Sequence, residues 1–183
     1  MERKEGRGNI ERMRIVPATA DEADRRIADL LRLLRDSVDG GASVGFLPPL
    51  RDDEARTYWG GVVGALRGDS RLLWLALDDE RVVGTVQLDL CGKGNGLHRA
   101  EIIKLLVHSA QRRRGIARAL MTAAEAEAHR LGRSLLVLDT RVGDAAEPLY
   151  RSRGWICSGV IPQYARNGDG GLDGSAFYYK LLE

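Results

Sequence analysis

The chain has 183 residues, of which 44% are hydrophobic and 30% charged, and its formal net charge is +2. This length fits one domain with a sizeable core. A protein that binds nucleic acid over a broad basic face is expected to carry more charge and more aromatic residues than the 5% found here. No apolar run reaches the roughly 18 residues of a membrane span, and residues 1–14 are too charged for a signal peptide. These features indicate a cytoplasmic protein with neither nucleic acid nor a membrane as its partner.

Cysteine and histidine are sparse and scattered. The two cysteines, Cys91 and Cys157, form no C-x-x-C pair, and the three histidines do not cluster. The sequence therefore predicts neither a disulfide scaffold nor a metal site.

The first third of the chain reads as a tail, a strand and two helices. Residues 1–12 are polar and charged, so we expect a flexible tail ahead of a single domain over residues 13–183. A short strand over residues 13–18 precedes Thr19, which we expect to cap a helix with an apolar stripe. Residues 39–50 form a loop that is either a connector or a substrate lid. A second helix is expected after it.

The middle of the chain alternates strands with helices. Residues 72–77 and 82–90 read as a hairpin, and residues 101–107 as an apolar strand. The helix expected over residues 115–131 places Leu131 on its apolar face and Glu125 on its polar face. Residues 135–138 are almost continuously apolar, as in a strand covered on both faces.

A helix over residues 145–152 and strands near residues 155–161 and 176–182 complete the domain. Residues 101–139 should form a right-handed parallel crossover. The order predicts an α/β (α+β) fold with a mixed, mostly antiparallel central sheet of about six or seven strands, flanked by about four helices.

Three consecutive arginines, Arg112 to Arg114, precede Gly115 at the junction between the strand over residues 101–107 and the helix that follows. Unpaired N–H groups at a helix N-terminus bind phosphate, and a glycine lets the phosphate approach the backbone. A solvated basic turn is the alternative, but the flanking strand and amphipathic helix favour a phosphate site.

These residues resemble the GNAT superfamily of N-acetyltransferases. The segment Arg112-x-x-Gly115-x-Ala117 fits its Q/R-x-x-G-x-G/A signature, and residues 149–155, LYRSRGW, fit its L-Y-x-x-x-G-[FWY] segment. Shorter stretches, LLVLDTRVGDAAEPLY, IPQYA and FYYKLL, are similar to the tabtoxin-resistance type of acetyltransferase.

The resemblance implies a GNAT-like acyl-CoA N-acyltransferase fold and acetyl-CoA as co-substrate. It implies that the pyrophosphate of acetyl-CoA is held at Arg112, Arg113, Arg114, Gly115, Ile116, Ala117 and Arg118. It also implies that the pantetheine arm runs along Leu105, Leu106 and Val107, where a backbone N–H is the expected oxyanion donor.

Acetyl transfer to an amine needs an acid for the leaving thiolate and a base for the ammonium proton. Tyr150 is our candidate acid, because a phenol with a pKa of about 10 is protonated at neutral pH, and the resemblance implies the same role. Glu101 is our first candidate base, at the spacing found in histone-type members of the superfamily. Asp139, at the end of an apolar strand, is the rival, and ordered water is a third alternative. We expect Lys104 and His108 to face solvent, and Phe46 and Tyr164 to pack in the core rather than line the acceptor pocket.

The predicted function is acetyl transfer from acetyl-CoA to a primary amine of a small molecule, such as an amino-acid-like toxin, an antibiotic or a metabolite. The alternatives are a protein N-terminal or lysine acetyltransferase, and a non-catalytic CoA-binding module. The sequence gives neither the acceptor nor the oligomeric state, and a homodimer stays open.

Overall fold

The computed structural model describes residues 13–183. The tail predicted over residues 1–12 lies outside the described residues. The strands are β1 (Met13–Pro17), β2 (Arg71–Asp78), β3 (Arg81–Leu90), β4 (Arg99–Val107), β5 (Leu135–Arg141), β6 (Ile156–Arg166) and β7 (Leu172–Leu181). The helices are α1 (Ala20–Arg25), α2 (Ile27–Asp39), α3 (Asp52–Arg67), α4 (Ile116–Arg130) and α5 (Glu147–Ser152), with short 3₁₀ turns η1 (Gly94–Gly96) and η2 (Ser109–Gln111).

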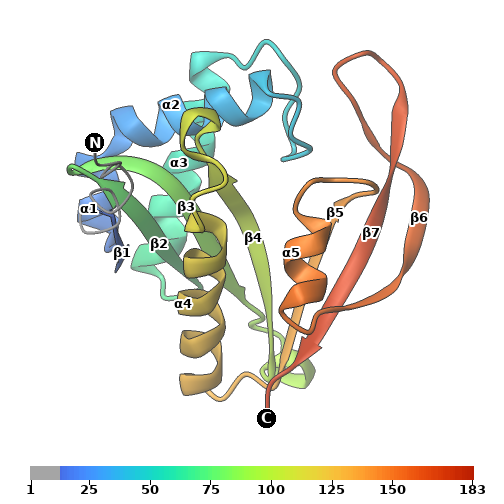
Figure 1. Cartoon of the computed structure of the whole chain (residues 1–183). Coiled ribbons are helices and arrows are strands. Elements are labelled where there is room, and N and C mark those ends of the chain that lie inside the picture. The colour runs from blue at the N-terminus through green and yellow to red at the C-terminus, as the bar shows by residue number, and fades with distance from the viewer. Residues whose placement is uncertain (1–12) are drawn as a thin grey trace, which may run out of the picture.

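The seven strands form one mixed sheet in the order β1-β2-β3-β4-β5-β7-β6 (Figure 1). Only the β4–β5 pair is parallel, and every other neighbouring pair is antiparallel. The predicted fold class is therefore confirmed. The first predicted helix is divided into α1 and α2 at Arg26, whose side chain turns to the carbonyl and carboxylate of Glu80 in the β2–β3 turn.

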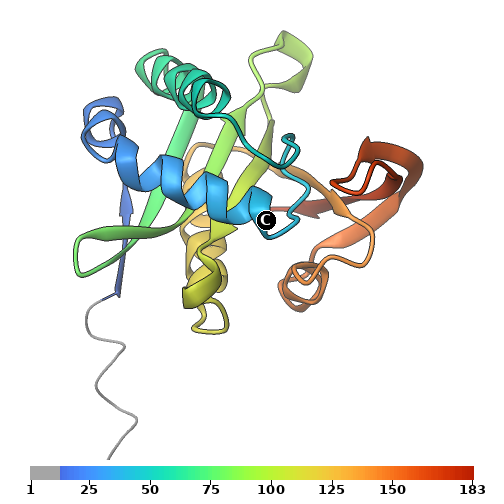
Figure 2. The same ribbon diagram turned by 90° about the horizontal axis from the view of Figure 1, so that it is seen from above.

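Helices cover the two faces of the sheet unequally. Helices α1, α2 and α3 lie on one face, and α4 and α5 on the other (Figure 2). The first set packs on β2, β3 and the end of β4, with Trp59 fully buried among them. It does not extend over β5, where Leu136 and Leu138 are buried but Leu135 and Val137 are only partly covered. The expectation that β5 is covered on both faces is therefore wrong.

Glu125 in α4 is buried, whereas the sequence predicted it on the polar face of the helix. Glu125 is 7% exposed, and it accepts hydrogen bonds from Arg153, from Trp155 Nε1 at 2.9 Å and from Lys180 Nζ at 2.7 Å. These partners come from the segment that follows α5 and from β7, so their position was not evident from the helix pattern. Leu131, expected in the core, is instead exposed at the C-cap of α4.

Replacing Glu125 by Ala should destabilise the fold by about 3 kcal/mol, because it leaves two partly buried cations, Arg153 and Lys180, without their counter-ion. That loss corresponds to a fall in Tm of about 10 °C for a domain of this size. Glu127→Ala is the control, since it removes only a surface pair with Arg130 and should lose about 0.5 kcal/mol or less. Thermal melts of both variants test this, and equal Tm values would contradict it.

The same network makes stability depend on pH. Burial raises the pKa of Glu125, but the hydrogen bonds from Arg153, Lys180 and Trp155 outweigh it, so the pKa lies below the ordinary value of 4.5. The stabilisation is thus fully present above pH 4.5 and is lost as the pH falls through the lower folded-state pKa.

Candidate active site

Strands β4 and β5 part soon after they begin. They pair only at Arg99↔Leu135, Ala100↔Leu136 and Glu101↔Val137, and then diverge toward their C-terminal ends (Figure 1). Beyond Glu101, β4 still pairs with β3 on its other side. Among the described residues, the edge of β4 that faces β5 thus has no strand partner, and its backbone is available to a ligand. We call this opening the wedge.

A β-bulge in β4 lies at the wedge. Thr85 pairs with Leu106 and Gln87 with Ile103, so β4 carries one extra residue there. Lys104, within the bulge, has a φ of 51°, in the left-handed region. The bulge shifts the alternation of the strand, so that Leu105 packs on the side of α4 while Leu106 is buried on the side of α1–α3.

Two predicted carboxylates border the wedge. Burial raises the pKa of Glu101, and the negative charges of Asp139 and Asp89 add to that shift. Asp139 is exposed at the C-terminal end of β5, where its Oδ2 accepts a hydrogen bond of 2.7 Å from Ser175 Oγ. The structure thus brings both carboxylates to one opening.

Tyr150 borders the wedge from α5. It is 6% exposed, and its ring centroid lies 6.3 Å from that of Trp155 and 5.9 Å from that of Tyr178. Burial raises its pKa, and the charges of Asp144 and Asp139 raise it further. Within residues 13–183 no hydrogen bond to the Tyr150 hydroxyl is recorded, so that hydroxyl keeps its proton free to donate.

The loop between β4 and α4 has the backbone geometry of an anion site. Arg113 and Gly115 adopt left-handed φ values of 65° and 79°. α4 begins with no side-chain cap and no acidic residue in its first turn, so its first N–H groups keep their positive dipole end uncompensated. A Cβ built on Gly115 would meet no protein atom within 4 Å. The space in front of this glycine is therefore open to a ligand.

The arginines of this loop differ in what they contact. Arg114 donates to Asp78 Oδ2 at 3.0 Å, and Arg118 to Ser152 Oγ at 3.2 Å. Arg112 donates to the carbonyl of Val107 at 3.4 Å. These guanidinium groups brace the loop and α4, and Arg112, Arg113 and Arg118 are all exposed residues. The loop therefore presents both an open backbone at Gly115 and exposed arginine side chains.

Asp36 in α2 binds the start of the same loop. This contact was not identified from the sequence. The two oxygens of Asp36 accept from the N–H of Ser109 at 2.7 Å and from its Oγ at 2.6 Å. Although burial opposes it, the hydrogen bonds from Ser109 lower the pKa of Asp36. His108 is partly buried beside Asp36, with 3.8 Å between Nε2 and Oδ1. The expectation that His108 faces solvent is therefore wrong. No sequence signal links two residues so far apart in the chain.

Lys104 is also partly buried, against expectation. Its Nζ lies 5.5 Å from the centroid of the Tyr58 ring. The bulge causes this, because it reverses the direction that simple alternation predicts for the side chain.

A cavity of about 420 Å³ lies near the C-terminal end of β5. The loop between α2 and α3 and the β6–β7 hairpin line its two sides, and Phe46, Pro48 and Arg141 are among its lining residues. Arg141 donates to the carbonyl of Gly41 at 2.9 Å and lies 3.8 Å from Asp173, so it joins the loop to the hairpin. Phe46 lines this cavity and is also partly buried against the core on the α1–α3 side of the sheet, where it stacks edge-on against Tyr58. Tyr164 is 50% exposed and packs against Phe177, so its predicted core position is wrong.

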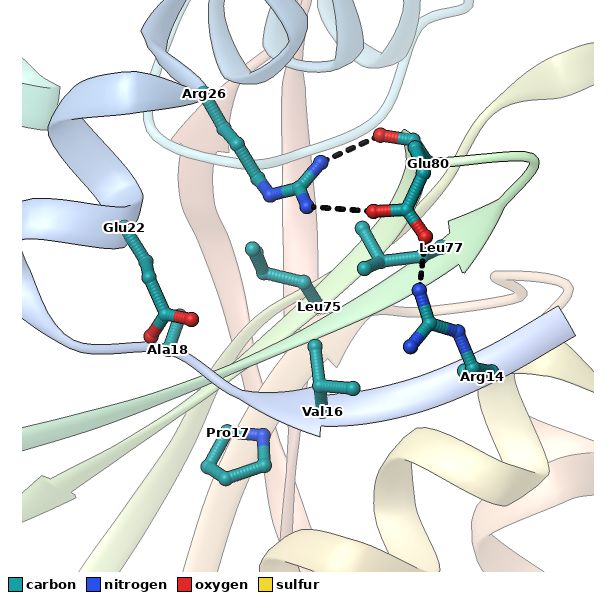
Figure 3. A pocket seen from close by; sticks show the side chains of 9 residues that line it. All are labelled: Arg14, Val16, Pro17, Ala18, Glu22, Arg26, Leu75, Leu77 and Glu80. Carbon is teal, nitrogen blue, oxygen red and sulfur yellow. Dashed lines mark hydrogen bonds and ion pairs between the residues drawn. The ribbon is translucent and has the colours of Figure 1, made fainter.

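A smaller cavity of about 150 Å³ lies between α1 and the strands β1 and β2 (Figure 3). Arg14 and Arg26 point into it, and both bind the carboxylate of Glu80 (Figure 3). Because β1 is an outer strand of the sheet, this cavity is separate from the wedge between β4 and β5. Its two arginines are already paired with Glu80.

Over residues 13–183 no group of three or more His, Cys, Asp or Glu side chains is placed to hold a metal ion. In the same part of the chain, no helix has the length and apolar character needed to cross a membrane.

Comparison with known proteins agrees with this geometry. Residues 31–155 match the acetyltransferase (GNAT) family. An uncharacterized N-acetyltransferase in the hisH-hisA intergenic region of Azospirillum brasilense is 30% identical over 129 residues, which cover 69% of this chain and 75% of that protein.

Solved structures share the fold. A GCN5-related N-acetyltransferase from Kribbella flavida is 24% identical with a TM-score of 0.77, covering 94% of this chain and 99% of that one. yncA of Salmonella typhimurium, solved with its cofactor acetyl-CoA, is 18% identical with a TM-score of 0.78, covering 93% and 94%. The chain therefore belongs to the GNAT family, the acetyl-CoA-dependent N-acetyltransferases that its sequence resembles.

Proposed function

We propose that the chain transfers the acetyl group of acetyl-CoA to the primary amine of a small molecule by direct attack in a ternary complex. The observation that carries this proposal is the wedge: an unpaired strand edge bordered by Glu101, Asp139 and Tyr150. The uncapped N-terminus of α4 follows at the end of the same strand. Acetyl-CoA supplies the activated thioester, and the chain supplies the groups that position it and move protons.

The backbone around the wedge fits acetyl-CoA. The uncapped N–H groups at the start of α4 and the open space at Gly115 suit a pyrophosphate. The free edge of Leu105–Val107 offers strand-like hydrogen bonds to an extended amide arm. An N–H of the same edge would stabilise the oxyanion that develops on the acetyl group.

Different side chains serve as the acid and as the base. Tyr150 is buried and protonated, so it can give its proton to the leaving thiolate. Glu101 is the better base, since its raised pKa lies nearer to the working pH. Asp139, held by Ser175, is suited to bind the substrate ammonium.

The half-open cavity near the C-terminal end of β5 supports a small acceptor. Its volume of about 420 Å³ lies within the range of small-molecule sites. The loop of residues 41–48 and the hairpin limit the room for a folded protein surface, although an extended N-terminal peptide is the alternative. An amino-acid-like toxin as acceptor rests on the narrower tabtoxin-resistance resemblance alone.

The donor site is tested with Gly115→Ala. Saturating acetyl-CoA at about 100 times its Kd should stabilise the chain by about 2.7 kcal/mol. The alanine should lose at least about tenfold in affinity, because its Cβ enters the phosphate space. Gly132→Ala is the matched control: Gly132 ends α4 with a φ of 71° and equally open surroundings. Both variants should lose about 1–2 kcal/mol of stability. Equal acetyl-CoA affinities in calorimetry would contradict the assignment.

The acceptor class is tested by thiol release with two sets of acceptors, small primary amines and short peptides with free N-termini or lysines. We expect the best small amine to exceed the best peptide in kcat/KM by at least about tenfold, or about 1.4 kcal/mol of transition-state binding. The reverse order would assign a protein acceptor. Acetyl-CoA binding without thiol release for any amine would indicate a non-catalytic CoA-binding module.

The acid is tested with Tyr150→Phe. Loss of the hydroxyl should lower kcat about 100-fold while the KM for acetyl-CoA changes little. Tyr178→Phe is the control. It removes a hydroxyl from the same aromatic cluster, but this hydroxyl donates to Glu147 at 2.5 Å instead of facing the wedge. Steady-state kinetics on the best amine would rule out the role if both variants turned over like the parent chain.

A further inference from the structure

Lys104 occupies the strand edge on which acetyl transfer would take place. It lies in the β4 bulge, three residues after the last β4–β5 pair and directly before Leu105. Its carbonyl is fixed by the hydroxyl of Thr85 at 3.1 Å. The backbone at this point is therefore held in place, while the side chain is a long flexible amine.

The amine of Lys104 lies between the wedge and the loop that follows α2. Its Nζ is 5.5 Å from the ring centroid of Tyr58 and 3.9 Å from the position of a Cβ built on Gly45. Among the described residues it makes no ion pair within 4.0 Å. It is thus an amine beside the wedge, on the side of the sheet that α1–α3 cover, without a close counter-ion among the described residues.

Three charged groups and one aromatic ring face Lys104, each from a different element. Burial lowers its pKa, and Arg71 of β2 adds to the shift. Asp139 of β5 and Glu101 of β4 act in the opposite direction, and Tyr58 of α3 presents its ring face. The net lowering increases the fraction of neutral amine, which is the nucleophilic form.

The chain has four lysines, and their settings differ. Lys4 lies outside the described residues, and Lys93 is exposed in a turn. Lys180 is engaged by Glu125 at 2.7 Å and by the carbonyl of Arg153 at 2.8 Å. Of the three described lysines, only Lys104 combines partial burial with an amine free of an ion pair.

We propose that Lys104 is an internal acceptor, acetylated by acetyl-CoA bound in the wedge of its own chain. The Nζ lone pair forms a bond to the acetyl carbonyl carbon, and the C–S bond breaks with its electron pair remaining on sulfur. The proton released from Nζ ends on that sulfur, by way of the acid and base groups of the site. The products are Nε-acetyl-lysine and free coenzyme A. This inference rests on the proposed function.

Self-acetylation would alter the side of the wedge on which Lys104 lies. It replaces a cation that faces Glu101 and Asp139 with a neutral, longer amide, which occupies room that an external amine would use. The reaction is therefore expected to compete with acceptor turnover, and an added good acceptor should slow it.

The test is incubation of the full chain with trideuteroacetyl-CoA, without any acceptor, followed by digestion and mass spectrometry of the lysine peptides. Lys104 should be labelled at least about tenfold faster than Lys93, the exposed control for uncatalysed acetylation. The rate should rise with pH as Nζ loses its proton. Tyr150→Phe should slow labelling of Lys104 about tenfold or more and leave Lys93 unchanged.

Two further samples define the site. Lys104→Arg keeps the positive charge but removes the nucleophile, so it should remove the fast label while still binding acetyl-CoA. Urea-unfolded chain should label its lysines at similar rates.

Labelling of Lys104 no faster than Lys93, or labelling unaffected by Tyr150→Phe, would overturn the proposal. If the chain is stabilised by acetyl-CoA in a thermal melt but Lys104 is not labelled, the internal acceptor is wrong and the proposed function stands. If acetyl-CoA produces no thermal shift, both are wrong.

Discussion

The parting of β4 and β5 is the constraint on which the rest of the site depends. Backbone N–H and C=O groups inside a sheet need partners, and an interior strand normally finds them on both sides. β4 finds them in β3 along most of its length but in β5 at only three residue pairs. The resulting row of backbone groups can accept an extended chain of amides as a substitute strand. The fold keeps the opening because β5 is held elsewhere, by β7 along its whole length from Leu135 to Arg141.

The loop between β4 and α4 is held in place by side chains of α2 and β2, which leaves its backbone at Gly115 open to a ligand. Asp36 takes both donors of Ser109, and Asp78 takes the guanidinium of Arg114. Asp36 lies in α2, and Asp78 lies at the end of β2. The loop is therefore attached to two elements that already pack in the core on the α1–α3 side of the sheet. The arginine run therefore has two roles: part of its charge orders the loop, and the left-handed turns at Arg113 and Gly115 direct the N–H groups outward. Such preorganisation reduces the entropy lost when an anion binds.

Local features of the site were predictable from sequence, and long-range ones were not. The Thr19 cap, the glycine at the start of α4 and the apolar strands follow from short-range rules, and the structure has them. The buried carboxylate of Glu125 was missed because its partners lie 28 to 55 residues away in the chain. Lys104 was misplaced because one extra residue in β4 reverses the face of everything after it. The wedge itself was implied only by family resemblance, since strand register depends on the whole sheet.

One exposed carboxylate, that of Asp139, influences the pKa values of several groups around the wedge. Asp139 raises the pKa of Glu101 and of Tyr150, and it opposes the lowering of the Lys104 pKa. Its influence on all three indicates that they surround one small volume. For Glu101 the shift makes a stronger base near neutral pH, and for Tyr150 it secures the proton that a leaving thiolate would take. In the proposed mechanism, the charge of this carboxylate favours proton removal by Glu101 and keeps Tyr150 protonated until the thiolate forms. The Oδ2 of Asp139 accepts a hydrogen bond from Ser175 Oγ of the neighbouring strand β7, which fixes the side chain. In the proposed mechanism, Glu101 and Asp139 thus have different roles: Glu101 is the base, and the charge of Asp139 raises the pKa of Glu101 and holds Tyr150 in its protonated form.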